Sequence, residues 1–172
     1  MSATDELVTQ CLEALKAERP AIAAKEAVER AVRDRLLAAE LSHEPGIRAL
    51  YRGEDLTIGH VVIPQRPAAA PNPVAHNHLM WAVIGIMHGG EDNAFFRRAR
   101  DTIEPSGGRV LGEGDVLALG SDTIHAVKNP SSERVSSALH VYGGDLLGTA
   151  RRMWCEPDLR EEPYDYARVT GV

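Results

Sequence analysis

Apolar residues recur at helical spacing in the first quarter of the chain. Between Asp5 and about Glu18, Leu, Val and Cys side chains return every three or four positions, which is the period of one helix face. Pro20 either closes this helix or opens the next one, because proline lacks the N–H that a helix interior needs. A second segment with helical spacing, rich in Ala, Glu, Arg and Leu, extends from about Ala21 to Leu41. The pattern predicts two α-helices within an N-terminal segment of residues 1–45.

After Gly46 the pattern changes to short β-rich runs separated by Gly, Pro, Asp and Ser. The runs are IRALYR, LTIGHVVIP, MWAVIGIM, AFFRRA, GRVLG, DVLALG, HAVKN and SSALHVYGG. Short strands at this spacing favour a β-sandwich or barrel over alternating α/β units. The proline-rich stretch 65–73 predicts a loop that leads into His76, and the stretch 158–168 predicts a solvated tail packed by its tyrosines. We expect a single domain, in which residues 46–172 form a barrel with a C-terminal extension and the helices pack on it.

Composition and charge argue against nucleic-acid binding and membrane association. The 172 residues carry 19 basic and 25 acidic side chains, a net charge of -6, and neither sign forms a block suited to nucleic acid or a membrane. The first residues, MSATDELVTQ, lack the basic start and apolar core of a signal peptide, so a cytoplasmic location is expected. Cys11 and Cys155 lie far apart in no metal-binding spacing and are predicted to be free thiols.

The candidate chemistry begins at His76-Asn77-His78. Side chains alternate across an extended strand, so the two imidazoles are expected on one face, where they could chelate one ion. A third ligand is needed, and His125 is the candidate, because a glycine turn, an apolar strand and another turn deliver it to the start of a further strand. The remaining histidines are interpreted differently. His43 is expected to be a solvated capping residue, His60 a satisfied barrel residue and His88 an exposed turn residue.

These motifs carry a resemblance to a known superfamily. HNH before a glycine-ended strand, followed by Gly114, Gly120, His125 and Asn129 in a G(x5)G(x4)H(x3)N pattern, resembles the two motifs of the cupins. The resemblance implies a mainly β fold, the double-stranded β-helix or jelly-roll barrel, with a metal ion inside. Many metal cupins supply a glutamate soon after the second histidine, but Ala82 stands there. The resemblance therefore implies a site of three histidines without a carboxylate.

Within the cupins, the three-histidine arrangement resembles the cysteine dioxygenase-like thiol dioxygenases, which hold non-haem iron. The similarity covers about residues 47–144, including the segment from Glu91 to Arg98 and the late-strand pair His140 and Tyr142. In that family a His-x-Tyr pair lies beside the iron, so both residues are expected to be catalytic. A hydroxyl at this position can donate a hydrogen bond or a proton.

Two departures refine this resemblance. Animal-type enzymes carry a crosslinking cysteine where Val83 stands, so the kinship is with the bacterial branch. The family usually has a serine where Ala138 stands, so a Ser-His-Tyr relay is truncated or rerouted. Ser136 would share the strand face of His140 by alternation.

Arginine suits a substrate carboxylate because its planar fork pairs with both oxygens. Arg48 resembles the position at which the family anchors the carboxylate, with Arg52 and Arg66 as rivals.

The resemblance then implies an iron enzyme that oxidises a small carboxylated thiol, such as cysteine or 3-mercaptopropionate, to its sulfinate with O2. Ni or Zn could replace Fe(II) in recombinant protein. Two alternatives stay open: a metal cupin with C–C cleavage or isomerase chemistry, and a non-catalytic small-ligand binder. The protein is expected to be a monomer or homodimer.

Overall fold

Strands dominate the computed structural model, which describes residues 1–170. Strands hold 41% of the residues and helices 21%, as expected for a mainly β protein. No helix in the described part of the chain is long and apolar enough to cross a membrane.

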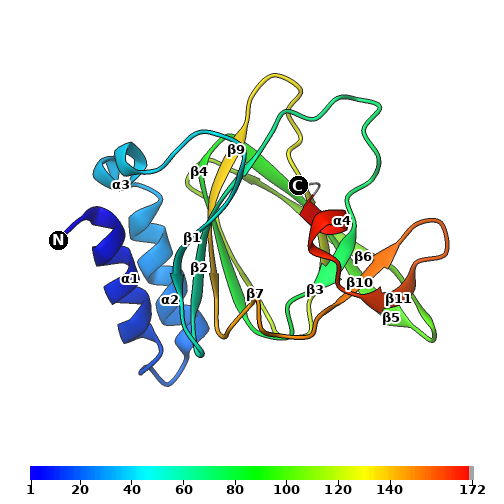
Figure 1. Ribbon diagram of the computed structural model, residues 1–172, viewed down its shortest axis with the longest axis horizontal. Helices are drawn as coiled ribbons and strands as arrows, with labels where there is room; N and C mark the ends of the chain where they lie inside the picture. The colour runs from blue at the N-terminus through cyan, green and yellow to red at the C-terminus, as the bar shows by residue number, and fades with distance from the viewer. Residues whose placement is uncertain (171–172) are drawn as a thin grey trace.

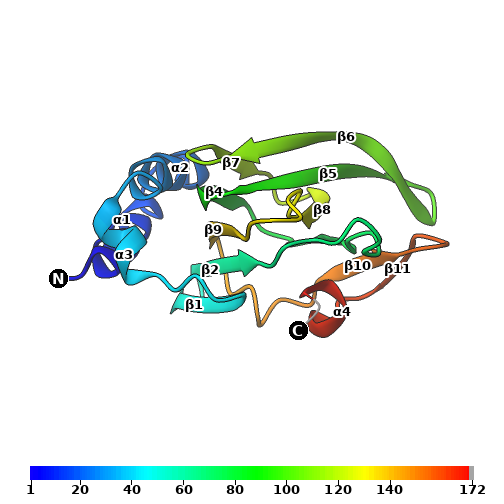
Figure 2. The same cartoon turned by 90° about the horizontal axis from the view of Figure 1, so that it is seen from above.

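The strands form two antiparallel sheets that enclose the interior (Figures 1 and 2). The first sheet has the order β1 (Gly46–Arg52), β2 (Thr57–Ile63), β9 (Ser136–Tyr142), β4 (Ala82–His88) and β7 (Val116–Leu119). The second has the order β10 (Arg152–Cys155), β11 (Arg160–Pro163), β6 (Thr102–Gly112), β5 (Gly90–Ala99), β8 (Ile124–Lys128) and β3 (Ala75–Asn77). It closes on itself because β3 also pairs with β10. This is the predicted double-stranded β-helix with N-terminal helices.

Three N-terminal helices cover the outer face of the first sheet (Figure 1): α1 (Ala3–Ala14), α2 (Pro20–Ala31) and α3 (Arg35–Glu40). A capping box between Ser2 and Asp5 starts α1, and Pro20 opens α2. The single helix expected from residue 21 to 41 is wrong. The Asp34 side chain accepts hydrogen bonds from the N–H groups of Leu36 and Leu37, which caps a separate helix α3.

The helices and the sheet share one hydrophobic cluster. Buried side chains of α1 and α2 contact Ile58 on β2, Val83 on β4, and Leu139 and Val141 on β9. Gly85 on β4 permits close contact, because a Cβ there would lie 2.3 Å from Val28 Cγ1 of α2. The residues of β9 that alternate with this cluster face the barrel interior. The cluster therefore fixes the strand that carries His140 and Tyr142.

Two segments differ from the sequence-based expectation. Most residues from 158 to 168 are exposed, as expected, but the stretch is not a free tail. It contains β11, which pairs with β10 and β6, and a short helix α4 (Tyr166–Thr170) follows; β10 also pairs with β3. The expected apolar run beginning at Met80 is a strand only from Ala82. The first two residues of the preceding histidine motif, His76 and Asn77, lie on β3, in the other sheet.

Candidate metal centre

The structure brings His76, His78 and His125 together inside the barrel. His76 and His125 are direct partners in the antiparallel register of β3 and β8, and their ring centroids are 4.8 Å apart. His78 lies one residue beyond β3, and its ring centroid is 5.2 Å from that of His76. Leu79 follows with a φ of 58°, in the left-handed region that helps turn the chain toward β4. The strand is shorter than expected, yet the two imidazoles of the HNH motif still meet.

Hydrogen bonds outside the cluster orient two of the rings. Asn93 Oδ1 lies 3.0 Å from His125 Nδ1, and the Val74 carbonyl oxygen lies 3.2 Å from His76 Nδ1. Because each oxygen can only accept, each Nδ1 carries the hydrogen and each Nε2 keeps a free lone pair. His125 Nε2 is 3.4 Å from His78 Nε2. The free lone pairs therefore converge inside the cluster.

Burial keeps these imidazoles neutral near pH 7. It lowers the pKa of His76 to about 4, with the nearby Arg151 charge adding to the effect and the Val74 hydrogen bond opposing it. It also lowers the pKa of His78 and His125 well below the ordinary value, and the neighbouring histidines add to this decrease. Neutral imidazole is the form that binds metal.

The cluster fits one divalent transition metal ion. One candidate ligand atom from each histidine lies within 4.8 Å of the others. Two nitrogens each about 2.1 Å from one ion are about 3.0 to 3.4 Å apart at angles of roughly 90–109°, which matches the separation between His78 and His125. Within residues 1–170 the cluster of potential ligands contains these three histidines and no carboxylate. Three protein ligands leave coordination positions for a substrate.

His140 and Tyr142 lie beside the histidine cluster on β9. The Tyr142 ring centroid is 4.9 Å from that of His78, and the Tyr142 hydroxyl is 2.9 Å from His140 Nδ1. Burial raises the pKa of the Tyr142 phenol, and the Arg151 charge opposes this shift. The phenol is therefore neutral and hydrogen-bonded next to the candidate metal position.

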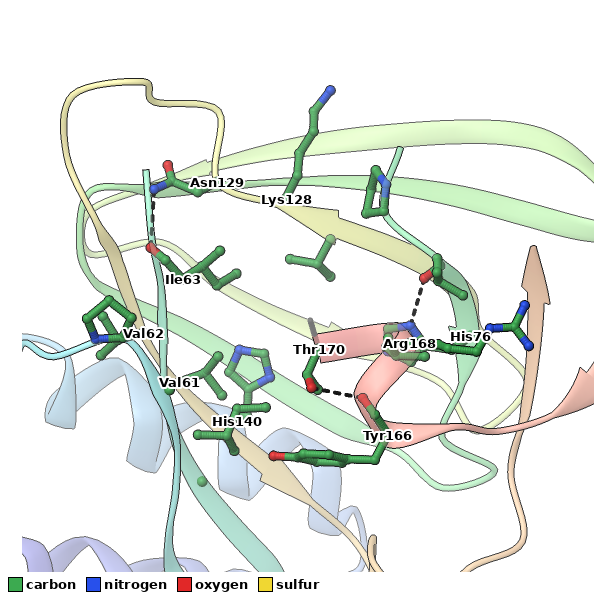
Figure 3. A pocket seen from close by; sticks show the side chains of 18 of the residues that line it. Val61, Val62, Ile63, His76, Lys128, Asn129, His140, Tyr166, Arg168 and Thr170 are labelled. Atoms are coloured by element: carbon green, nitrogen blue, oxygen red, sulfur yellow. Dashed lines mark hydrogen bonds between the residues drawn. The ribbon is translucent and has the colours of Figure 1, made fainter. Parts of the chain in front are cut away.

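A cavity of about 980 Å³ opens onto the three histidines and also reaches His140 and Tyr142. Its walls come from β2, β8, the loop between β2 and β3, and the C-terminal segment with Tyr164, Tyr166 and Arg168. Figure 3 shows His76 and His140 among the lining side chains, together with Tyr166, Arg168 and Thr170 of the C-terminal segment. The C-terminal extension thus forms one wall of the cavity.

The structure does not bring Arg48 to the cavity, contrary to the sequence-based expectation. Arg48 pairs in register with His60, whose side chain lies on the face of β2 opposite the cavity-lining Gly59 and Val61. The Arg48 guanidinium instead donates to the Glu44 carbonyl oxygen. Of the two rivals, Arg52 pairs with Asp145, whereas Arg66 lines the cavity but donates to backbone carbonyls of its own loop.

Arg151 is the arginine that the sequence analysis missed. It is 6% exposed, its guanidinium carbon lies 3.7 Å from the centroid of the Tyr164 ring, and its Nε has no hydrogen-bond partner. The Tyr164 ring in turn contacts the His76 ring, with centroids 5.9 Å apart. Arg151 forms no salt bridge with any acid of the described chain. A buried cation without a counter-ion therefore lines the cavity next to the cluster.

Two further interior residues were not predicted to act at the site. Glu91 and Asn93 alternate along β5 and face inward, where Asn93 reaches His125 and Glu91 lies 3.5 Å from His140. The two-residue spacing of these polar side chains was the available signal, since alternate residues of a strand share a face. His60 is buried and its Nε2 bonds Ser137, but its Nδ1 has no hydrogen-bond partner in the described chain, so the expectation of a satisfied residue holds only in part. His43 is exposed as expected, and His88 ends β4 with its side chain 44% exposed.

No protein-family model matches the chain. Its structure is similar to that of the DMSP lyase DddQ from Ruegeria pomeroyi, with a TM-score of 0.45 and 21% identity over 62% of this chain and 49% of that chain. The match thus spans about half of the lyase. A cupin superfamily protein from Desulfitobacterium hafniense gives a TM-score of 0.46 and 16% identity over 63% of this chain and 88% of that chain. The cupin domain of Cnp3 from Schizosaccharomyces pombe gives a TM-score of 0.45 and 16% identity over 59% of this chain and 61% of that chain.

The strand order and the interior cluster together describe the molecule at the level of fold and site. It is a double-stranded β-helix protein in which His76, His78 and His125 could hold one metal ion.

Proposed function

We propose that the protein is a mononuclear non-haem iron enzyme of the thiol dioxygenase type, which converts a small carboxylated thiol and O2 to the sulfinate. The observation that carries the proposal is the set of three neutral histidines without a carboxylate, His78 and His125 buried and His76 partly buried, flanked by the hydrogen-bonded His140 and Tyr142. Neutral ligands leave the full charge of a divalent ion available to an anionic substrate.

His76, His78 and His125 would hold the metal. Fe(II), when bound, would supply a Lewis acid that favours the thiolate and a redox centre that allows the sulfur to react with O2. Imidazole ligands also suit Zn and Ni, so the native metal has to be measured. The reaction is balanced, because both oxygen atoms pass to the sulfur and RSH becomes RSO2H.

Arg151 is the proposed anchor for the substrate carboxylate. Its guanidinium group lines the cavity, is buried, and has no acidic partner among the described residues. The Tyr164 ring stacks on it and so fixes its orientation. A carboxylate there would receive charge-assisted hydrogen bonds and neutralise the buried charge. Arg151 takes the role that the sequence analysis gave to Arg48.

The cavity bears on the size of the substrate. Cavities of roughly 300–1,000 Å³ hold ligands up to drug size, and this one, at about 980 Å³, lies at the upper end of that range. Its walls are mostly apolar around Val61, Ile63 and Val127. A thiol acid with a longer or apolar substituent would therefore bury more surface than cysteine does.

The experiment is anaerobic loading with Fe(II), followed by measurement of oxygen uptake and mass spectrometry of the product. The thiol panel contains cysteine, 3-mercaptopropionate, cysteamine and longer mercapto acids. We expect thiol-dependent oxygen uptake and a product 32 Da heavier than the thiol, because two oxygen atoms are added. Binding of iron without oxidation of any thiol would reject the proposal and favour a cupin with different metal chemistry or a ligand-binding protein.

A further inference from the structure

Glu91 is a buried carboxyl group that the proposed reaction does not use directly. It lies on β5 with none of its surface exposed, and neither of its oxygens has a hydrogen-bond partner in the described chain. Its closest basic neighbour is His140, with Oε1 3.5 Å from Nε2, and that nitrogen has no other partner. The two side chains come from opposite sheets and meet across the interior.

His140 connects this carboxyl group to the metal centre. Its other ring nitrogen, Nδ1, lies 2.9 Å from the Tyr142 hydroxyl, and the Tyr142 ring contacts His78. Carboxyl, imidazole and phenol thus form one chain that ends beside a candidate metal ligand. The Glu91 contact, at 3.5 Å, is longer than the hydrogen bond between His140 and Tyr142. A neutral imidazole carries hydrogen on only one nitrogen, so the choice of that nitrogen decides which group donates at each end.

We infer that Glu91 is a positioning residue that sets the direction of the hydrogen bonds from His140 to Tyr142. This role requires Glu91 to be a carboxylate, because a carboxylate can only accept, whereas a carboxylic acid would donate. A carboxylate selects the form of His140 with hydrogen on Nε2. Nδ1 is then an acceptor, and the Tyr142 hydroxyl donates to it. The phenol oxygen therefore presents its lone pairs to the cavity, where it accepts a hydrogen bond from substrate instead of donating one. The consequence for the substrate depends on the proposed function.

Ser136 does not take this position, although the sequence analysis considered a rerouted serine relay. Ser136 lies on the same face of β9 as His140, but four residues of strand separate their backbones by about 13 Å. Its buried hydroxyl has no hydrogen-bond partner in the described chain. Ser136 is thus a suitable control for a change at Glu91.

The direct test is the proton position on His140 in the full-length, metal-free protein near neutral pH. Long-range ¹H–¹⁵N NMR distinguishes the two neutral forms and the charged form of an imidazole, and loss of the signal in His140→Gln assigns it. We expect hydrogen on Nε2 in the wild type and in Ser136→Ala. In Glu91→Gln the amide can either donate to Nε2 or accept from it, so the preference for Nε2 should be lost and part of the hydrogen should appear on Nδ1. A wild-type His140 with hydrogen on Nδ1 or on both nitrogens overturns the inference, even if the variant does not fold.

A second measurement uses the iron-loaded enzyme. If Glu91 acts through His140, Glu91→Gln should lower kcat about 10- to 100-fold, the usual effect of removing an orienting partner, with KM and iron content unchanged within about twofold. Glu91→Asp should recover part of the loss. An unchanged kcat in Glu91→Gln contradicts the inference. Absence of thiol oxidation in the wild type rejects the proposed function instead, and the NMR result still decides the role of Glu91.

Discussion

Asn93 and His125 are joined across neighbouring strands by a contact of 3.0 Å between Asn93 Oδ1 and His125 Nδ1. Both side chains are buried, and the contact directs His125 Nε2 toward the centre of the histidine cluster, where a metal ion could bind. Loss of such a partner typically costs 10- to 100-fold in metal affinity. We expect Asn93→Leu to weaken Zn²⁺ or Fe²⁺ binding by about that factor in competitive chelator titrations.

Asn93→Asp is the matched control, because a carboxylate accepts from His125 Nδ1 as the amide oxygen does. It also removes the Asn93 Nδ2 donor, which has no partner in the described chain. Affinity should be kept or increased. Equal weakening by Asp and Leu would show that the contact does not orient the ligand.

The three-histidine cluster itself predicts one metal ion per chain. His125→Ala should remove stoichiometric binding in metal analysis and eliminate the thermal stabilisation that added metal gives, since stabilisation follows the ratio of ligand concentration to Kd. His88→Ala is the control, because the His88 side chain is exposed beside Glu113 and lies outside the cluster. Full metal content in His125→Ala would disprove the assignment.

Arg151 and Arg48 separate the structural assignment from the sequence-based one. Arg151→Gln should raise KM for carboxylated thiols about 10- to 100-fold, because charge-assisted hydrogen bonds contribute roughly 1.5–3 kcal/mol. Cysteamine, which lacks a carboxylate, should be affected less. Arg48→Gln should leave KM unchanged, since its side chain lies away from the cavity. The reverse result in steady-state kinetics would restore Arg48 as the anchor.

The residues of the candidate site that stand in short sequence motifs could be identified from the sequence. The histidines of the HNH motif are neighbours, and His125, His140 and Tyr142 stand in recognisable strand and turn patterns, so all five could be named. Arg151 could not be, because its position depends on the pairing of β10 with β3, in which Met153 pairs with His76 far back in the sequence. A short polar segment such as 158–168 gives little sign that it will add a strand to a barrel.

The hydrophobic pattern locates strands but does not determine their register, which is why the fold could be predicted and the position of Arg48 could not. Alternation and turn residues locate strands, and these define a β-barrel without any knowledge of register. The face on which a given side chain lies does depend on register, since a shift of one residue reverses it. Arg48 lies on a correctly predicted strand, but its pairing with His60 directs it away from the cavity.

His60 should make stability dependent on pH. Burial lowers its pKa from 6.5 to about 4, with the Arg48 charge adding to the shift. Below pH 6.5 the unfolded chain therefore binds a proton that the folded protein does not. The free energy of unfolding decreases as the pH is lowered from 6.5 to about 4. Between pH 7 and pH 5 the loss due to His60 is about 2 kcal/mol. Urea unfolding of the metal-free protein at pH 7 and pH 5 measures this loss in the free energy of unfolding. In His60→Gln the loss should be smaller than in the wild type by about 2 kcal/mol. In the exposed His88→Gln it should equal that of the wild type.

Gly85 on β4 tests whether the N-terminal helices support the site or only the fold. A Cβ at Gly85 would lie 2.3 Å from Val28 Cγ1 and 2.7 Å from Val32 Cγ1, so α2 must shift. Overpacking of this kind costs roughly 1–3 kcal/mol, and chemical denaturation should show that loss for Gly85→Ala. Gly112→Ala, whose Cβ would meet only Asp115 Oδ2 at 3.8 Å, is the control and should lose far less. Metal affinity should stay unchanged in Gly85→Ala, because β3 and β8, which carry His76 and His125, belong to the other sheet. A parallel loss of metal affinity would mean that packing of α2 on β4 is transmitted across the barrel to the histidine cluster.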